Sequence, residues 1–324
     1  MKITILDDYQ NVVRTLDAFK KVEGHEVTTW NDHTKGTDVL AERLKDTEAL
    51  VLIRERTPLR APLITRLPNL KIVSQRSVYP HIDVDALTAR GIVLSSDMHA
   101  GKPSNATAEL AWGLIIAAMR RISQEAARLK AGQWQGSVGL GLRGRTLGVL
   151  GYGRIGKVVA GFGEAFGMNV VAWGRDGSRE RAQADGVAVA ESRQAFFEQC
   201  DVISIHVRLK PDTRGMVTSE DFARMKPSAL FVNTSRSGLI APGALEEALG
   251  RGRPGMAAVD VYEEEPVLGA KHPLLHMDNA VCTPHLGYVE RDDYEWQFSS
   301  IFDQIIAFAA GKPINVVNPE VLTK

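Results

Sequence analysis

Residues 146–166 read TLGVLGYGRIGKVVAGFGEAF, an apolar run followed by three closely spaced glycines and then by a helical pattern. The apolar run predicts a buried strand, and the residues after the last glycine predict a helix. The first glycine permits a tight turn, the second lets phosphate groups approach the backbone, and the third lets the helix pack near the strand. Amide groups at the start of that helix can then bind phosphates. The pattern predicts a dinucleotide site that includes Gly151, Gly153, Arg154, Ile155 and Gly156.

Short β-branched runs alternate with amphipathic segments on both sides of this stretch. Alternation of this kind predicts an α/β fold, here with two Rossmann-like domains, each a doubly wound parallel sheet, and an interdomain cleft. A segment from Ser104 or Asn105 to Gly132 predicts one long helix connecting the domains. We expect a discontinuous substrate-binding domain of residues 1–99 plus 286–324, ending in a helix up to Gly311 and an extended tail, and an NAD(P)-binding Rossmann domain of residues 100–285.

Composition indicates a soluble enzyme that acts on a small molecule. The 324 residues contain 39 basic and 39 acidic side chains, so no overall charge attracts the protein to nucleic acid or to a membrane surface. The amino terminus lacks the pattern of a signal peptide and no apolar run is long enough to span a bilayer, which predicts a cytoplasmic protein. Cys200 and Cys282 lie in apolar runs and are interpreted as buried thiols.

The residues after the next predicted strand bear on the choice between NAD and NADP. A carboxylate there accepts hydrogen bonds from the ribose hydroxyls of NAD and repels the 2′-phosphate of NADP. This strand ends in Gly174-Arg175-Asp176. Arg175 favours NADP through charge-assisted hydrogen bonds to a phosphate, whereas Asp176 keeps NAD open.

Three later strand ends carry polar residues, in the segments Asn233–Gly238, Asp260–Pro266 and Thr283–Gly287. Loops at the carboxyl ends of parallel strands gather around a ligand, so these segments should meet at the cofactor. Their sequences NTSRSG, DVYEEEP and TPHLG, behind the glycine turn, resemble those of the D-isomer-specific 2-hydroxyacid dehydrogenase family. The resemblance extends over nearly the whole chain and includes APLITRLPNLKIV, HIDVDALTARGI, ATAEL and GKPINVVNPE.

This resemblance implies that Arg236, Glu265 and His285 are catalytic in hydride transfer between NAD(P)H and C2 of a small 2-oxo or 2-hydroxy acid. Arg236 would bind the substrate carboxylate and polarise the C2 oxygen, and His285 would exchange the proton on that oxygen. Glu265 would fix the imidazole tautomer and favour its protonated form. The implied activity is similar to that of a glyoxylate or hydroxypyruvate reductase. Further cofactor-binding positions implied by the resemblance are His206, Val207, Thr234, Ser235, Asp260 and Gly287.

The predicted substrate side departs from the family pattern. Most members have a Gly-x-Gly loop whose amides hold the substrate carboxylate, but here Arg76 and Val78 replace both glycines. The replacements should stiffen the loop, and Arg76 either adds a positive group for a more acidic substrate or points outward. Arg54 and Arg56 resemble the other substrate loop, and the sequence leaves open which of them points inward. The candidate substrate-binding residues are Arg54, Arg76, Ser77, Val78, Arg236 and His285.

Two other functions stay open at this point. One is a formate or phosphite dehydrogenase on the same scaffold. Glu265 disfavours formate, because formate dehydrogenases of this fold have a glutamine in place of the glutamate that is paired with the histidine. The other is a dinucleotide-sensing scaffold like the corepressors that share the fold. We expect no metal, and the apolar helix ELAWGLIIAAM predicts a homodimer. Which 2-hydroxy acid is used cannot be inferred from the sequence.

Overall fold

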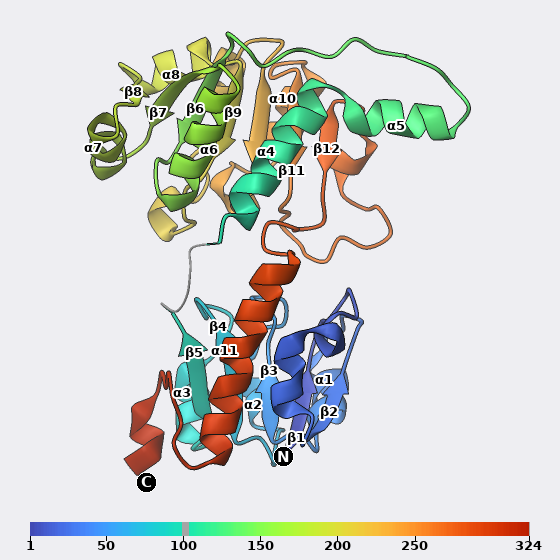
Figure 1. Cartoon of the computed structure of the whole chain (residues 1–324), viewed down its shortest axis with the longest axis vertical. Coiled ribbons are helices and arrows are strands. Elements are labelled where there is room, and N and C mark those ends of the chain that lie inside the picture. Colours follow the sequence, from blue (N-terminus) through green and yellow to red (C-terminus); the bar gives the residue numbers. More distant parts are fainter. Residues whose placement is uncertain (99–103, 324) are drawn as a thin grey trace. The chain divides into compact units, whose positions relative to one another are not determined.

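The computed structural model describes residues 1–98 and 104–323 and contains two compact units (Figure 1). The first consists of residues 1–103 and 291–324, and the second of Ser104–Glu290. The boundary expected near residue 99 lies at the edge of a stretch outside the described residues. The other division lies at Glu290 instead of residue 285, because Leu286 and Gly287 are hydrogen-bonded to Asp260 of the second unit. No helix in the described ranges is both long and apolar enough to cross a membrane.

The first unit contains a parallel sheet of five strands in the order β2-β1-β3-β4-β5. Each of them lies in one of the short β-branched runs of the sequence. The strands are β1 (Lys2–Ile5), β2 (Glu26–Thr29), β3 (Ala49–Val51), β4 (Ile72–Arg76) and β5 (Val93–Asp97).

Helices cover this sheet and bury its apolar side chains. One core cluster joins Leu50, Val73 and Leu94 of the strands to α1, α2 and α3. The last long helix, α11, packs against β4 and β5 (Figure 1). It carries buried polar groups that are hydrogen-bonded to β4. The helices of this unit are η1 (Val13–Thr15), η2 (Asp17–Val22), α1 (Thr37–Leu44), α2 (Ala61–Ile64), α3 (Val84–Ala89), α11 (Arg291–Ala309) and η6 (Pro319–Thr323).

The tail after α11 is extended only in part. Val316 forms an antiparallel bridge with Ser95, and the Asn318 side chain accepts from the Leu94 amide and donates to the Ile92 carbonyl. Asn315 has a positive φ and the last residues form η6, so the extended tail predicted for residues 313–320 is wrong at its end. Hydrogen bonding to the edge strand β5 explains the extended part.

The second unit contains a parallel sheet of seven strands in the order β12-β11-β10-β9-β6-β7-β8. The chain proceeds outward from β6 in one direction and from β9 in the other, so the point of reversal lies between these two strands, where ligands bind in such sheets. The predicted doubly wound α/β fold is confirmed. The strands are β6 (Thr146–Leu150), β7 (Asn169–Trp173), β8 (Ala188–Val189), β9 (Val202–Ile205), β10 (Leu230–Asn233), β11 (Met256–Val259) and β12 (Ala280–Cys282).

Helices lie on both faces of this sheet, as two separate core clusters show. One cluster contains α4 and α6, and the other contains α8, α9 and α10 (Figure 1). Cys200 is buried, as predicted, whereas Cys282 is only half-buried. The remaining helices are α6 (Arg154–Ala165), α7 (Asp176–Ala184), α8 (Arg193–Gln199), η3 (Pro211–Thr213), α9 (Ser219–Arg224), η4 (Ser237–Leu239), α10 (Ala244–Gly250) and η5 (Pro273–His276).

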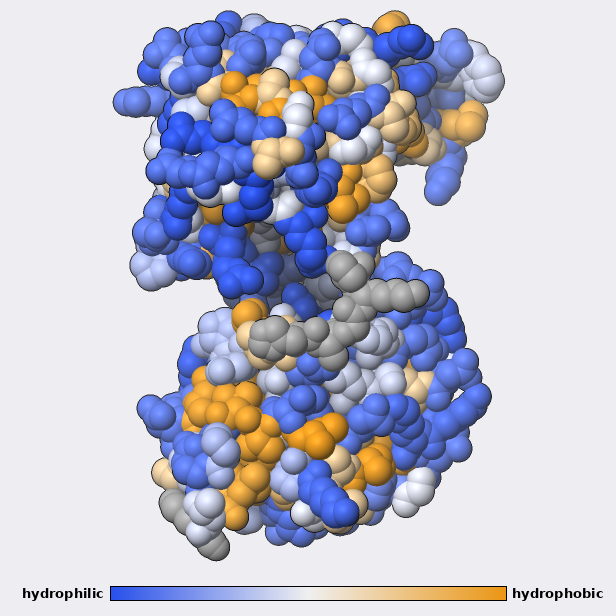
Figure 2. Space-filling model, turned by 60° about the vertical axis from the view of Figure 1, so that its left-hand side comes forward, coloured by the Kyte–Doolittle hydropathy of each residue, from blue (hydrophilic) through white to orange (hydrophobic). Residues whose placement is uncertain are grey.

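The single long helix predicted up to Gly132 is wrong, because it is divided into α4 (Ala106–Met119) and α5 (Ile122–Lys130). Arg121 takes a left-handed φ of 54° and breaks the first helix. Most apolar side chains of α4 pack within the second unit, whereas Leu110 and Ile116 are only partly buried. By contrast, α5 has no buried residue. The face of the molecule in Figure 2 is largely hydrophilic with separate apolar patches.

Candidate active site

The glycine turn is shaped as the sequence predicts. A side chain at Gly151, where φ is 97°, would meet the His206 carbonyl at 2.8 Å, and one at Gly156 would meet the Gly151 carbonyl at 2.4 Å. A side chain at Gly153 would meet nothing within 4 Å, which leaves open space over the start of α6. The turn is therefore tight on its protein side and accessible where α6 begins.

Arg154 and Ile155, the two residues between the last two glycines, offer their backbone amides to the dinucleotide site. Ile155 packs its side chain into the core, and the Arg154 guanidinium donates to the Ser104 carbonyl at 2.7 Å. The Tyr152 amide donates to Ser178 Oγ at 2.7 Å, which ties the glycine turn to α7. Sequence reasoning missed Ser178. A side chain at Gly174 would meet its Oγ at 2.9 Å, so the glycine and the small serine are needed together.

The charged residues after β7 are engaged with one another and with a nearby loop. Arg175 donates to Asp212 of η3 at 2.7 Å, and both side chains are about 60% exposed. Asp176 forms an ion pair with Arg179, which also lies over the Trp173 ring. The one acidic side chain of this turn is thus paired with an arginine.

Buried polar atoms without partners lie at the carboxyl ends of β9 and β10, next to the glycine turn. In the described part of the chain, neither His206 Nδ1 nor Thr234 Oγ1 has a hydrogen-bond partner, although His206 Nε2 contacts Ser204 Oγ at 2.9 Å. Burial lowers the pKa of His206 to about 4, so its ring is neutral near pH 7. Unpaired buried polar atoms are rare in native proteins. Together with the open space at Gly153, these atoms fit a bound dinucleotide.

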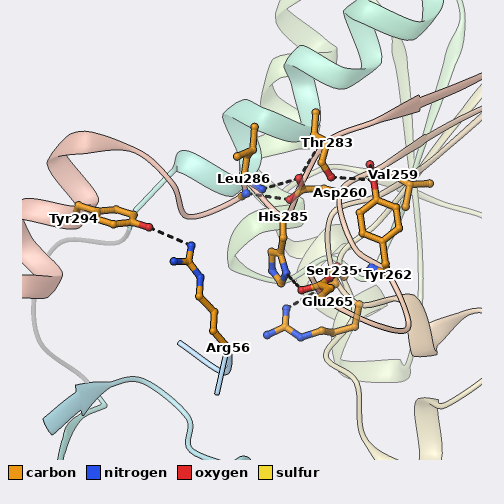
Figure 3. Close-up of polar contacts among 12 residues, drawn as sticks. Arg56, Ser235, Val259, Asp260, Tyr262, Glu265, Thr283, His285, Leu286 and Tyr294 are labelled. Carbon is orange, nitrogen blue, oxygen red and sulfur yellow. Dashed lines mark hydrogen bonds and ion pairs between the residues drawn. The ribbon is translucent and has the colours of Figure 1, made fainter. Parts of the chain in front are cut away.

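The structure brings together the predicted histidine and glutamate of the second unit (Figure 3). His285 Nδ1 lies 2.6 Å from Glu265 Oε2, and the other carboxylate oxygen accepts from the Tyr262 amide at 2.9 Å. Burial raises the pKa of Glu265, but the hydrogen bond and charge of His285, the Tyr262 amide and the Arg236 charge together bring it below its ordinary value. Glu265 is therefore an ionised partner that fixes the orientation of the ring.

Arg236 directly precedes the short helix η4, shortly after the end of β10. Its guanidinium donates to the Ser235 carbonyl at 2.7 Å, and its charge acts on Glu265. Asn233, which is fully buried, accepts from the Ser235 amide and donates to the Arg236 carbonyl. Ser235 Oγ also donates to the Ile205 carbonyl at 2.8 Å. Asn233 therefore holds the turn that presents Arg236, a role that sequence reasoning missed although an asparagine at a strand end was its signal.

Asp260 is buried and hydrogen-bonded to the loop that carries His285. One carboxylate oxygen accepts from Thr283 Oγ1 at 2.6 Å and from the Leu286 amide at 2.7 Å (Figure 3). The other accepts from the Gly287 amide at 2.9 Å. Burial raises the pKa of Asp260 above its ordinary value against these hydrogen bonds. Thr107 of α4 donates to the Gly287 carbonyl, a contact that sequence reasoning missed. His285 has a φ of 54°, so this network fixes an unusual backbone conformation.

The candidate substrate residues of the first unit lie at the ends of β3 and β4. Arg56 donates to the Asp7 carbonyl and to Tyr294 Oη (Figure 3), while its guanidinium lies over the Tyr9 ring. Arg54 has a φ of 57°.

At the end of β4, Arg76 contacts α11, and in the loop that follows, Ser77 has a left-handed backbone conformation. The Arg76 guanidinium lies 3.3 Å from the centre of the Trp296 ring on α11, and a role for its charge in substrate binding stays a prediction. Ser77 takes a left-handed φ of 78°, which costs a residue other than glycine about 1 kcal/mol. The strain is therefore at Ser77, between Arg76 and Val78, the two positions where glycine is replaced.

Comparison with known proteins agrees with this geometry. Residues 112–287 match the model of the NAD-binding domain of D-isomer specific 2-hydroxyacid dehydrogenases. The chain belongs to the D-isomer specific 2-hydroxyacid dehydrogenase family. A protein of Thermococcus litoralis named glyoxylate reductase is 33% identical over 97% of this chain and 95% of its own length.

Other relatives of this 2-hydroxyacid dehydrogenase carry a different name. A D-3-phosphoglycerate dehydrogenase of Methanocaldococcus jannaschii is 35% identical over 98% of this chain, which spans only 59% of that relative. A crystal structure from Ralstonia solanacearum, described as a candidate D-3-phosphoglycerate dehydrogenase, has 51% identity and a TM-score of 0.95, covering 99% of this chain and 98% of that one. The family resemblance and its implied nicotinamide dinucleotide cofactor are thereby confirmed. This dehydrogenase acts on small 2-oxo or 2-hydroxy acids.

Proposed function

We propose that the chain reduces a small 2-oxo acid at C2, in the manner of a glyoxylate or hydroxypyruvate reductase, with Arg236, Glu265 and His285 as its catalytic residues. The 2.6 Å contact between His285 Nδ1 and Glu265 Oε2 carries the proposal. It leaves Nε2 as the ring atom that exchanges a proton with substrate. An ionised Glu265 stabilises the protonated ring, which is the form required as a general acid.

Each residue then has a distinct task in reduction. Arg236 binds the substrate carboxylate with its planar fork of donors and stabilises negative charge on the C2 oxygen. His285 donates a proton from Nε2 to that oxygen, and Glu265 stays ionised and holds the ring. The nicotinamide dinucleotide, when bound, supplies the hydride. The amides at the start of α6, His206, Val207, Thr234, Ser235, Asp260 and Gly287 are the residues we assign to holding it.

The function is tested by measuring absorbance at the nicotinamide band with glyoxylate, hydroxypyruvate, pyruvate and phenylpyruvate, and in the oxidative direction with 3-phosphoglycerate, formate and phosphite. We expect turnover with at least one 2-oxo acid. Oxidation of formate or phosphite alone would support the alternative dehydrogenases. Dinucleotide binding without turnover of any of these compounds would favour the sensing scaffold and contradict the proposed function.

We further propose that the cofactor is NADP, with NAD as the alternative. Arg179 beside Asp176 offsets the negative charge that would repel a 2′-phosphate, and Arg175 is held by an exposed pair with Asp212. Exposed pairs contribute little to stability, so a phosphate can replace the carboxylate. We predict that Arg175→Ala lowers kcat/KM for NADPH about tenfold and changes the value for NADH less than twofold.

The partner of Arg175 offers a matched comparison in the same assay. Asp212→Asn releases the guanidinium without removing it, and we expect the KM for NADPH to fall or stay unchanged. A wild-type preference for NADH that survives both substitutions would contradict the assignment of NADP.

We also propose a homodimer, which rests on α5 and the segment after it instead of on α4. Large apolar side chains there are between 50% and 95% exposed: Ile122, Leu129, Trp134 and Val138. Exposed apolar side chains concentrated in one stretch of the chain are a candidate contact surface for a second copy. Light scattering should give twice the 35.4 kDa of one chain, and a mass of one chain would contradict the proposal.

A further inference from the structure

Gln75 is fully buried at the end of β4 and binds the loop that follows it. Its Nε2 donates to the Ser77 carbonyl and to Ser96 Oγ, each at 2.8 Å. Ser96 Oγ in turn donates to the same Ser77 carbonyl at 2.7 Å. The Ser77 carbonyl is thus held by two donors on the buried side of the loop. The Val78 carbonyl lies 3.5 Å from the same Nε2.

These contacts determine where the loop amides point. In a trans peptide, the carbonyl of one residue and the amide N–H of the next point in opposite directions. Because the Ser77 and Val78 carbonyls face Gln75, the Val78 and Tyr79 N–H groups face away from it. Neither amide donates to an acceptor within residues 1–98 and 104–323. They lie at the carboxyl end of a parallel strand, where ligands bind.

Successive amides that point to one side, next to a residue in the left-handed region, form a concave site for an anion. Glycine usually provides that conformation, but here Ser77 adopts a φ of 78°. The Ser77 amide itself donates to the Asp97 carbonyl at 3.0 Å, which fixes the loop from its other side. The loop therefore presents two amides that have no acceptor in the described residues, although both of its expected glycines are replaced.

We infer that Gln75, with Ser96, is a positioning residue for substrate, which it serves by orienting the Val78 and Tyr79 amides toward the substrate carboxylate. The inference rests on the proposed function, since it names a carboxylate as the anion. Gln75 acts through the loop and does not contact substrate. Its loss should therefore weaken binding of the acid and leave the hydride-transfer residues intact.

The test is Gln75→Met, which keeps the volume of the side chain and removes its donor. We expect KM for the accepted 2-oxo acid and the Kd of the carboxylate analogue oxamate to rise about tenfold each, with kcat changed less than threefold and cofactor affinity unchanged. The Kd is measured calorimetrically with enzyme and reduced cofactor. If Gln75→Met fails to fold, Ser96→Ala removes the second donor and should raise the same two constants by a smaller factor.

Gln304 is the matched control, because it is a second fully buried glutamine in the same unit. Its Nε2 donates to Ser74 Oγ and to the Gln75 carbonyl, between α11 and β4, and not to the loop. Gln304→Met should lower thermal stability but leave KM and the Kd of oxamate within twofold. In an active wild type, unchanged constants in the folded Gln75 or Ser96 variant, or an equal rise in the Gln304 variant, would overturn the inference. An inactive wild type would refute the proposed function instead.

Discussion

Replacing His285 by asparagine should lower kcat for reduction of the 2-oxo acid about 10³-fold, with little change in the affinity for cofactor. A positioned general acid contributes roughly 10²- to 10⁴-fold to a rate. Asparagine is the sharpest replacement, because His285 has a φ of 54° and asparagine tolerates this backbone conformation better than alanine. The loss then reports the missing proton donor and not a rearranged loop. Steady-state kinetics and fluorescence titration of the reduced cofactor measure the two quantities.

His276 provides the control for this substitution. It lies in the same unit, is exposed, and contacts the Ala270 carbonyl through Nε2 at 2.8 Å. His276→Asn should keep kcat within twofold of the wild type. If His285→Asn retained more than a tenth of wild-type kcat, His285 would not be the proton donor.

Sequence reasoning led to the proposed catalytic positions but could not by itself separate one glutamate from its neighbours. Glu263, Glu264 and Glu265 are consecutive and chemically identical, and only the resemblance selected the third. The structure separates them by geometry, because Glu265 reaches His285 while Glu263 contacts His272 at 3.0 Å. A short turn decides which carboxylate faces which histidine, and Tyr262 of this turn donates to the carbonyl of Thr283, which lies 21 residues further along the chain.

The fold could be predicted from the sequence more fully than the residues that position the site residues. Alternating strands and helices follow from local periodicity, which the sequence displays directly. The break at Arg121 does not, since a left-handed arginine follows from tertiary packing and not from local preference. Similarly, the roles of Asn233 and Gln75 depend on carbonyl groups that become neighbours only after the strands have paired. Residues that act by holding other residues leave little trace in a single sequence.

Replacing Glu265 by glutamine should lower kcat/KM for reduction about 10²-fold at pH 7, the second largest effect that we expect. The substitution keeps the shape of the side chain and removes the negative charge that stabilises the protonated ring of His285. Partners that orient a functional histidine typically contribute 10- to 100-fold. Glu263→Gln is the matched control, because it alters an adjacent glutamate that also contacts a histidine, and it should keep kcat/KM within threefold.

The pH dependence distinguishes this role from a purely structural one. Reduction needs His285 protonated and oxidation needs it neutral, so activity should fall with rising pH in the first direction and rise in the second. The pKa of Glu265 lies below its ordinary value, because contacts with His285, the Tyr262 amide and Arg236 outweigh the effect of burial. Its charge is therefore present throughout the neutral range and is lost only when the pH falls through that lowered pKa. In Glu265→Gln the charge is absent at every pH, so the midpoints of both profiles should move to lower pH. A uniform loss of rate with unchanged midpoints would mean that Glu265 only supports the fold of its turn.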